Sequence, residues 1–292
     1  MQTLVLLLAL PLLIILFIHL RAVGKFDRYA RMAMKHVRSG LGPDNDDDLE
    51  PGPIPKIVQD FALKAGAADN NPPLSVFFHQ LCEMRMNPGD DWMNLRAEQV
   101  IGIQKLGFVW YAEQKKSLFV TMRVVDAFVD GRGALNVRAL GSLPIADMSG
   151  PGADEAELMR YLAELPWAPD AILHNPQLRW HQLDDKTVEV EAGQGGVLAK
   201  VRLYFDDEGD IVEMQADSRG RSEGMEVVPR PWRGYYSDYR KIEGEFAGET
   251  GFRRIPTKAE IGWVLDDGYF AYWRGQIATY GLEHERRASS RK

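Results

Sequence analysis

The chain has 292 residues, of which 45% are hydrophobic and 26% are charged, so it is long enough to bury a large hydrophobic core. Its net charge is −7, although residues 21–38 carry a local excess of basic side chains. The acidic remainder argues against a nucleic-acid-binding protein, which would need a basic face to meet phosphates. The lone cysteine, Cys82, excludes an internal disulfide framework and a CxxC metal site.

Residues 3–20, TLVLLLALPLLIILFIHL, are almost wholly apolar and nearly long enough to cross a hydrocarbon core of about 30 Å. No basic residue precedes them, as one would in a cleaved signal peptide. The sequence therefore predicts that residues 1–20 form the transmembrane anchor of a single-pass cell-membrane protein. Because basic residues follow the span, we expect the body in the cytoplasm, with a periplasmic or extracytoplasmic body as the alternative.

Residues 21–41 are expected to form a basic amphipathic helix beside the anchor. Such a helix either lies among the lipid headgroups or packs on the body with its charged face in water, and the sequence leaves both interpretations open. Its apolar stripe consists of Val23, Phe26, Ala30, Ala33 and Val37.

An acidic, Pro- and Gly-rich linker is expected at residues 42–53, because its composition cannot bury enough apolar surface to fold. One domain is expected over residues 54–282, followed by a charged tail at residues 283–292. Hydrophobic periodicity predicts a short helix at residues 55–66 and then mostly strands.

Alternating strands and turn residues predict an α+β fold with an antiparallel meander and a few helices. A hairpin is expected at residues 117–141, with its turn at Gly131–Gly133. Three strands are expected between residues 186 and 217, with turns at Gly193–Gly196 and Asp206–Gly209. The strongest turn signal is Asp266–Gly268, between two strands near the end of the chain.

One helix is expected within this meander, at about residues 154–165. Asp154 is expected to cap it, with Glu157 completing a capping box, and Pro166 to end it. Trp167 then begins an apolar plug against the sheet. The buried stripe of this helix is predicted to be Leu158, Tyr161, Leu162 and Leu165.

Four segments resemble an uncharacterised bacterial family of membrane-anchored proteins over roughly residues 54–282: RYLAELPWAPDAIL, PWRGYYSDYRKIEG, RRIPTKAEIGWVLDDG and YFAYWRGQI. The Tyr-x-x-Arg-x-x-x-Gly segment followed by Ile-Pro is also distantly similar to lipoprotein carriers of the LolA/LolB type. That resemblance implies a half-barrel wrapped around helices, with an apolar cavity that receives acyl chains. It implies no catalytic residues.

The last hairpin is apolar and aromatic on both faces, which implies either a covering of helices or a cavity in a curved sheet. We expect a ligand-binding chamber in which Arg160 and Arg274 pair with acidic head groups. The alternative is that the aromatic residues are ordinary core and that Arg160 pairs with Glu164. The aromatic residues expected in the chamber are Trp110, Trp167, Trp180, Trp263, Tyr272 and Trp273.

No metal or other cofactor is expected, since His174 and His181 match no metal-binding spacing and Cys82 is expected to be buried. The preferred function is non-enzymatic binding of a lipid or lipid-modified ligand at a membrane. A membrane-tethered scaffold for a protein partner is the first alternative. A hydrolase is the second, with a carboxylate pair drawn from Asp126 and Asp130 or from Glu243 and Glu245.

Overall fold

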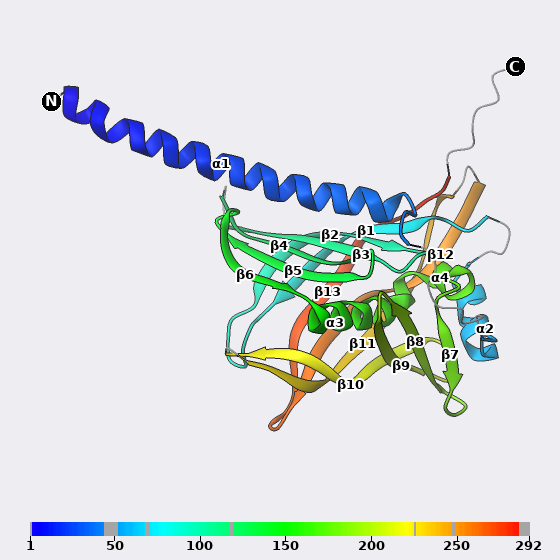
Figure 1. Ribbon diagram of the computed structural model, residues 1–292. Helices are drawn as coiled ribbons and strands as arrows, with labels where there is room; N and C mark the ends of the chain where they lie inside the picture. The colour runs from blue at the N-terminus through cyan, green and yellow to red at the C-terminus, as the bar shows by residue number, and fades with distance from the viewer. Residues whose placement is uncertain are drawn as a thin grey trace, which may run out of the picture.

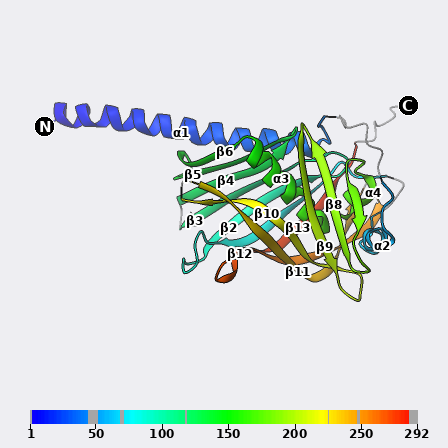
Figure 2. The same cartoon turned by 60° about the horizontal axis from the view of Figure 1, so that its bottom comes forward.

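The computed structural model describes residues 2–43, 52–67, 71–116, 119–224, 226–246 and 249–285. Within these residues one antiparallel sheet of 13 strands curves around a short helical segment, as Figures 1 and 2 show. The predicted curved antiparallel meander with a few helices is therefore confirmed. Most of the predicted linker and tail lie outside the described residues.

The helices are α1 (Gln2–Arg38), α2 (Lys56–Lys64), α3 (Pro151–Ala163), a 3-10 turn η1 (Leu165–Trp167) and α4 (Pro169–His174). The strands are β1 (Ser75–Met84), β2 (Met93–Gly102), β3 (Phe108–Lys116), β4 (Phe119–Val129), β5 (Arg132–Ala139), β6 (Leu143–Ser149), β7 (Arg179–Gln182), β8 (Thr187–Gln194), β9 (Val197–Phe205), β10 (Ile211–Glu223), β11 (Glu226–Phe246), β12 (Glu249–Leu265) and β13 (Gly268–Glu283).

The sheet has two arms that meet where β1 pairs with β13. One arm runs from β1 to the edge strand β6, and the other runs from β13 back to the edge strand β7. The chain between these two edges is α3, η1 and α4, which we call the insert (residues 151–174). The insert lies on the inner face of the sheet and closes the open side of the half-barrel (Figures 1 and 2).

The turns form where the sequence predicts them, because their residues tolerate the required backbone. Asp130 and Gly131 connect β4 to β5 with φ angles of 52° and 77°, and a two-residue hairpin turn needs positive φ at both positions. The turn lies one residue before the predicted Gly131–Gly133. The predicted turn at Asp266–Gly268 separates β12 from β13.

The predicted stripe of α3 is correct, but its predicted cap is wrong. Leu158, Tyr161 and Leu162 are fully buried against the inner face of the sheet. The helix begins three residues before Asp154, after Gly150, and has no side-chain cap. Asp154 Oδ1 instead accepts a hydrogen bond from the backbone N–H of Gly133 on β5, at 2.7 Å. The helix ends at Ala163, three residues before Pro166, which lies in the 3-10 turn η1. Trp167 is buried, as expected.

Helix α1 runs without a break from Gln2 to Arg38, so it includes the predicted anchor and most of the predicted juxtamembrane helix. Within the described residues, no helix is both long and apolar enough to cross a bilayer. The predicted transmembrane span is therefore not confirmed.

The second half of α1 packs on the outer face of the sheet, which is one of the two interpretations that the sequence left open. Phe26, Ala30 and Val37 are buried there, in a small second core with Val109 and Val125 of the sheet. Most basic side chains of this half are exposed to solvent, whereas Arg38 turns to the body, with its Nε 2.6 Å from Glu283 Oε2. This half of α1 is therefore a structural part of the body.

Because of this packing, removal of residues 1–18 should leave the stability of the fold unchanged, whereas removal of residues 1–50 should lower it. A chain that starts at residue 51 loses Phe26 and Val37 and exposes Val109 and Val125 to water. We expect its free energy of unfolding to be roughly 3–6 kcal/mol below that of a chain starting at residue 19, since each such side chain contributes about 1.5–3 kcal/mol on burial. Urea denaturation measures the difference, and equal midpoints would contradict the role assigned to α1.

Candidate functional site

The aromatic residues that the sequence singled out lie mainly in the core inside the half-barrel. Trp167 of η1 packs against Trp273 of β13, with ring centroids 6.3 Å apart. Trp263 of β12 stacks on Tyr272 of β13 at 5.8 Å. Trp110 of β3 is buried, and its indole N–H donates a hydrogen bond to Gln80 Oε1 at 2.8 Å. These side chains pack against one another and against the insert.

Among the other candidates, Trp180 belongs to the same buried core, whereas Arg274 lies outside it. Trp180 is buried on the edge strand β7. Arg274 lies on the outer face, where its Nε is 2.6 Å from Glu83 Oε2 and its guanidinium carbon is 4.3 Å from the centroid of Trp92. Trp273 faces inward, towards Trp167, so Trp273 and Arg274 do not line one chamber. The prediction that Arg274 stands at the mouth of the chamber is wrong.

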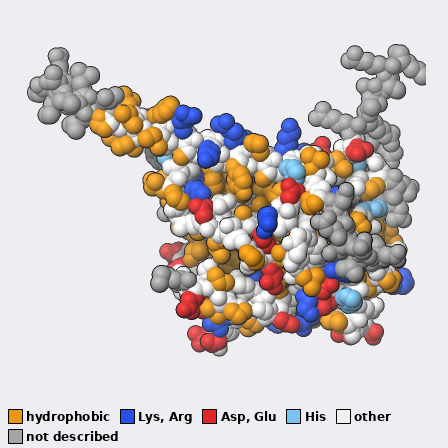
Figure 3. All heavy atoms as spheres, viewed as in Figure 1, with side chains coloured by type: hydrophobic (Ala, Val, Ile, Leu, Met, Phe, Trp, Pro, Cys, Tyr) orange, Lys and Arg blue, Asp and Glu red, His pale blue; other side chains and the backbone are white. Residues whose placement is uncertain are grey.

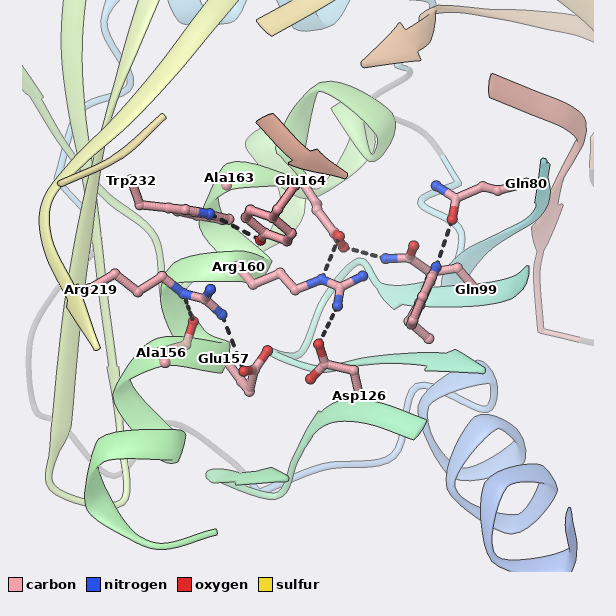
Figure 4. Close-up of polar contacts among 12 residues, drawn as sticks. Gln80, Gln99, Asp126, Ala156, Glu157, Arg160, Ala163, Glu164, Arg219 and Trp232 are labelled. Carbon is pink, nitrogen blue, oxygen red and sulfur yellow. Dashed lines mark hydrogen bonds and ion pairs between the residues drawn. The ribbon is translucent and has the colours of Figure 1, made fainter. Parts of the chain in front are cut away.

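Arg160 lies inside the half-barrel and has two carboxylate partners (Figure 4). Its Nη1 is 2.5 Å from Asp126 Oδ2 on β4, and its Nε is 2.8 Å from Glu164 Oε1 one helical turn later. The guanidinium also lies 5.2 Å from the ring centroid of Trp110. The predicted i,i+4 pair with Glu164 is confirmed. Gln99 of β2 donates its amide N–H to the other oxygen of Glu164.

A second buried arginine reaches α3 from the opposite arm of the sheet. Arg219 of β10 donates to the backbone carbonyl of Ala156 at 3.1 Å and to Glu157 Oε1 at 3.2 Å. Its guanidinium lies 4.5 Å from the ring centroid of Trp232. Glu157, which the sequence placed in a capping box, is therefore half of a buried ion pair. We call Asp126, Glu157, Arg160, Glu164 and Arg219 the interior charge cluster.

The interior charge cluster has three carboxyl groups against two guanidinium groups. Figure 4 shows the carboxyl groups of Asp126 and Glu157 side by side. Asp126 Oδ1 and Glu157 Oε2 are buried and accept no hydrogen bond from the described residues. A proton on Glu157 Oε2 can be donated to Asp126 Oδ1, which gives both oxygens a hydrogen bond and leaves the cluster without net charge, a state that burial favours.

Burial raises the pKa of Glu157 well above its usual value near 4.5, and the neighbouring Asp126 raises this pKa further. Arg219 and Arg160 oppose the effect. Burial raises the pKa of Glu164 as well, against the influence of Arg160. Burial and the neighbouring carboxyl group of Asp126 therefore both favour the protonated form of Glu157 in the folded chain.

Other candidate residues do not form a reactive site. Cys82 is buried, and desolvation raises the pKa of its thiol to about 12, which disfavours the nucleophilic thiolate. Asp130 pairs with His36 on the surface, 2.9 Å away, and shares no site with Asp126. His181 is exposed on β7. No group of His, Cys, Asp and Glu side chains that could hold a metal ion occurs among the described residues.

A groove with a volume of about 920 Å³ crosses the outer face, over β3, β2, β1, β13, β12 and β11. It lies on the same face of the sheet as α1. Charged side chains of both signs line it, among them Arg96, Glu113, Lys258, Glu260 and Arg274. The sequence analysis missed this groove, because its walls come from strands far apart in the chain.

The raised pKa of Glu157 predicts a pH dependence of stability. The folded chain holds a proton that the unfolded chain releases near pH 4.5, so folding takes up a proton and stability falls as pH rises towards the folded pKa. Glu157→Gln removes this dependence, and its amide can donate to Asp126. Relative to the native chain, the variant should gain about 1.4 kcal/mol per pH unit within that window.

Urea midpoints measured between pH 4 and pH 9 check this expectation. Glu155→Gln is the matched control, because Glu155 lies on the exposed side of the same helix. The control should follow the native curve. Parallel curves for Glu157→Gln and the native chain would contradict the shared proton.

Comparison with known proteins identifies the family and similar folds. The structure is similar to an outer-membrane lipoprotein-sorting domain from Vibrio parahaemolyticus, at 6% identity, with 80% of this chain and 93% of that chain covered and a TM-score of 0.44. It is also similar to a LolA superfamily protein from Nitrosomonas europaea, at 11% identity, with 78% and 94% covered and a TM-score of 0.41. A DUF1329 family protein from Desulfovibrio piger matches at 8% identity, with 80% and 94% covered and a TM-score of 0.40.

No curated protein sequence matches the chain. The model of the family of unknown function DUF6544 matches residues 45–275, which is most of the chain. The protein belongs to the DUF6544 family.

Proposed function

We propose that the protein binds a lipid or a lipid-modified ligand without catalysing a reaction. The acyl chain is taken up between the insert and the inner face of the sheet. The observation that carries this proposal is the way in which the insert is attached. Among the described residues, each hydrogen bond between insert and sheet uses a side chain, and none belongs to a backbone ladder. The insert can therefore separate from the sheet with every strand pairing intact.

The surface under the insert is suited to an acyl chain. Trp167 is covered on three sides by the rings of Phe78, Tyr236 and Trp273, at centroid distances of 5.7, 5.9 and 6.3 Å. Moving η1 outward exposes this aromatic surface, which an acyl chain can cover in its place. The gain for the ligand is the removal of its methylene groups from water, about 0.8 kcal/mol for each.

A membrane location is the second part of the proposal. Residues 12–18 and Leu20 of α1 are large and apolar, and each is 50–65% exposed. Only His19 interrupts this row. This part of α1 projects beyond the sheet (Figures 1 and 3). Exposed apolar side chains in such a row are costly in water and stable in lipid. Arg21, Lys25 and Arg28 follow on the exposed side of the helix, at the level of the headgroups.

A protein partner at the outer groove is the second candidate function. The mixed charges of the groove and the closely packed interior support it. Arg274→Glu reverses one charge of the groove and contacts no part of the interior. It should therefore leave lipid binding unchanged and weaken a protein interaction at the groove.

Lipid binding can be tested on a chain that starts at residue 19, which keeps the α1 packing and lacks residues 12–18 of the exposed apolar row. We expect it to carry extractable lipid and to bind a fluorescent fatty acid. Two additional methylenes should strengthen binding ~15-fold, from about 0.8 kcal/mol for each buried CH2. Amide hydrogen exchange in residues 151–174 should rise on binding, while exchange in β1 and β13 stays slow.

Native mass spectrometry with organic extraction, fluorescence titration and hydrogen exchange provide these measurements. A lipid-free chain that ignores the fatty acid would contradict the proposal and favour the protein partner. Binding without any change in exchange at residues 151–174 would place the ligand elsewhere.

The orientation can be tested with reporters. Because the basic flank follows the apolar row, we expect the body in the cytoplasm. A C-terminal alkaline phosphatase fusion should be inactive and a C-terminal green fluorescent protein fusion should be fluorescent. The reverse pattern would place the body outside the cytoplasm.

A further inference from the structure

The tip of the β5–β6 hairpin has an unusual composition for an exposed turn. Leu140, Leu143 and Ile145 are 56%, 57% and 62% exposed, although turns normally carry small or polar residues. Leu140 also has a φ of +49°, a conformation that a leucine adopts at an energetic cost. Neither core packing nor turn geometry accounts for large aliphatic side chains here.

This tip touches α1 at the point where the helix leaves the sheet. His19 Nδ1 lies 2.6 Å from the hydroxyl oxygen of Ser142. Gly141 lies so close to the helix that an added Cβ would be 3.4 Å from a methyl group of Val23. The guanidinium carbon of Arg138 lies 5.1 Å from the ring centroid of Phe26. The three aliphatic side chains of the tip therefore sit beside the base of the exposed apolar row of α1.

We propose that the β5–β6 tip is a second membrane contact, with Leu140, Leu143 and Ile145 inserted into the bilayer beside α1. This inference rests on the proposed function, because it takes the apolar row of α1 as the first contact. In Figure 3 apolar side chains cover the projecting part of α1 and recur on the body below it. The tip continues that surface, so the same lipid phase covers both.

The charges around this surface fit a bilayer with anionic lipids. Arg21, Lys25 and Arg28 are exposed on the first helical turns beyond the apolar row, within reach of lipid phosphates. The nearest acidic residue of the hairpin, Asp147, is neutralised by Arg138 at 2.6 Å. Cations next to exposed aliphatic side chains are the pattern of a membrane interface.

Two membrane contacts, one on α1 and one on the β5–β6 hairpin, determine the orientation of the body relative to the bilayer. The edge of the sheet that carries β6 faces the bilayer, while β7, at the opposite edge of the sheet, lies away from it.

The test uses the full chain in vesicles of phosphatidylcholine and phosphatidylglycerol. An environment-sensitive fluorophore is attached to Leu143→Cys, in a Cys82→Ala background that removes the native thiol. We expect a blue-shifted emission that lipid-borne quenchers suppress and aqueous iodide does not. Leu16→Cys on α1 reports the first contact. Leu183→Cys is the matched control, an equally exposed leucine in the turn after β7.

The outcomes separate the inference from the proposed membrane location. Lipid quenching at residues 16 and 143 but not at residue 183 supports the inference. Quenching at residue 16 alone overturns it and leaves the membrane contact of α1 in place. Absence of lipid quenching at both positions overturns the membrane location as well. Circular dichroism of each labelled chain shows that the fold is intact.

Discussion

The ion pairs between α3 and the two arms of the sheet are the constraint on which the rest of the fold depends. Arg160 binds Asp126 on β4, and Glu157 binds Arg219 on β10. Breaking a buried pair by removing one partner typically costs about 3–5 kcal/mol, because a charge is left without compensation in the interior. One helix of the insert thus holds both arms at a fixed separation, and the curvature of the half-barrel follows from it.

The interior charge cluster fixes the position of α3 relative to the sheet more than it adds to the stability of the fold. Desolvating charged groups costs about as much as their attraction returns, so an apolar interior would hold the sheet at least as tightly. What the charges supply is directional pairing at fixed points. The odd carboxyl group makes this pairing depend on one proton, which links the seating of the insert to pH. The same insert covers the aromatic inner face, so the proposed ligand would compete with the insert for that surface.

Local features of this fold could be predicted from the sequence, because they depend on neighbours in the chain. The alternation of strands, the Asp-Gly turns and the stripe of α3 follow from local preferences, and the Arg160–Glu164 pair follows from helix geometry. The prediction that joined Trp273 and Arg274 neglected that consecutive strand residues usually face opposite sides. Tyr272 and Trp273 both face inward only because the pairing of β12 with β13 is irregular there.

The interior charge cluster could not be predicted in the same way. Asp126 and Glu157 meet only because β4 and α3 lie in contact, and Arg219 reaches them from the other arm. Asp154 and Glu157 match a capping box in sequence, yet both side chains bond to the sheet instead, to Gly133 and Arg219. The pairing of β1 with β13 brings distant segments together, and the outer groove exists only through that pairing.

Helix α1 is packed on the sheet along its second half and exposed along its first half, and no break in the helix separates the two. Its second half is part of the outer core, through Phe26 and Val37, while its first half exposes an apolar row beyond the edge of the sheet. A continuous helix advances about 1.5 Å per residue, so Leu20 lies only about 9 Å along the axis from Phe26. That distance leaves no room for a flexible tether within the helix. A bilayer that accepts Leu20 must therefore meet the edge of the sheet, and the exposed leucines of the β5–β6 tip lie where it would arrive.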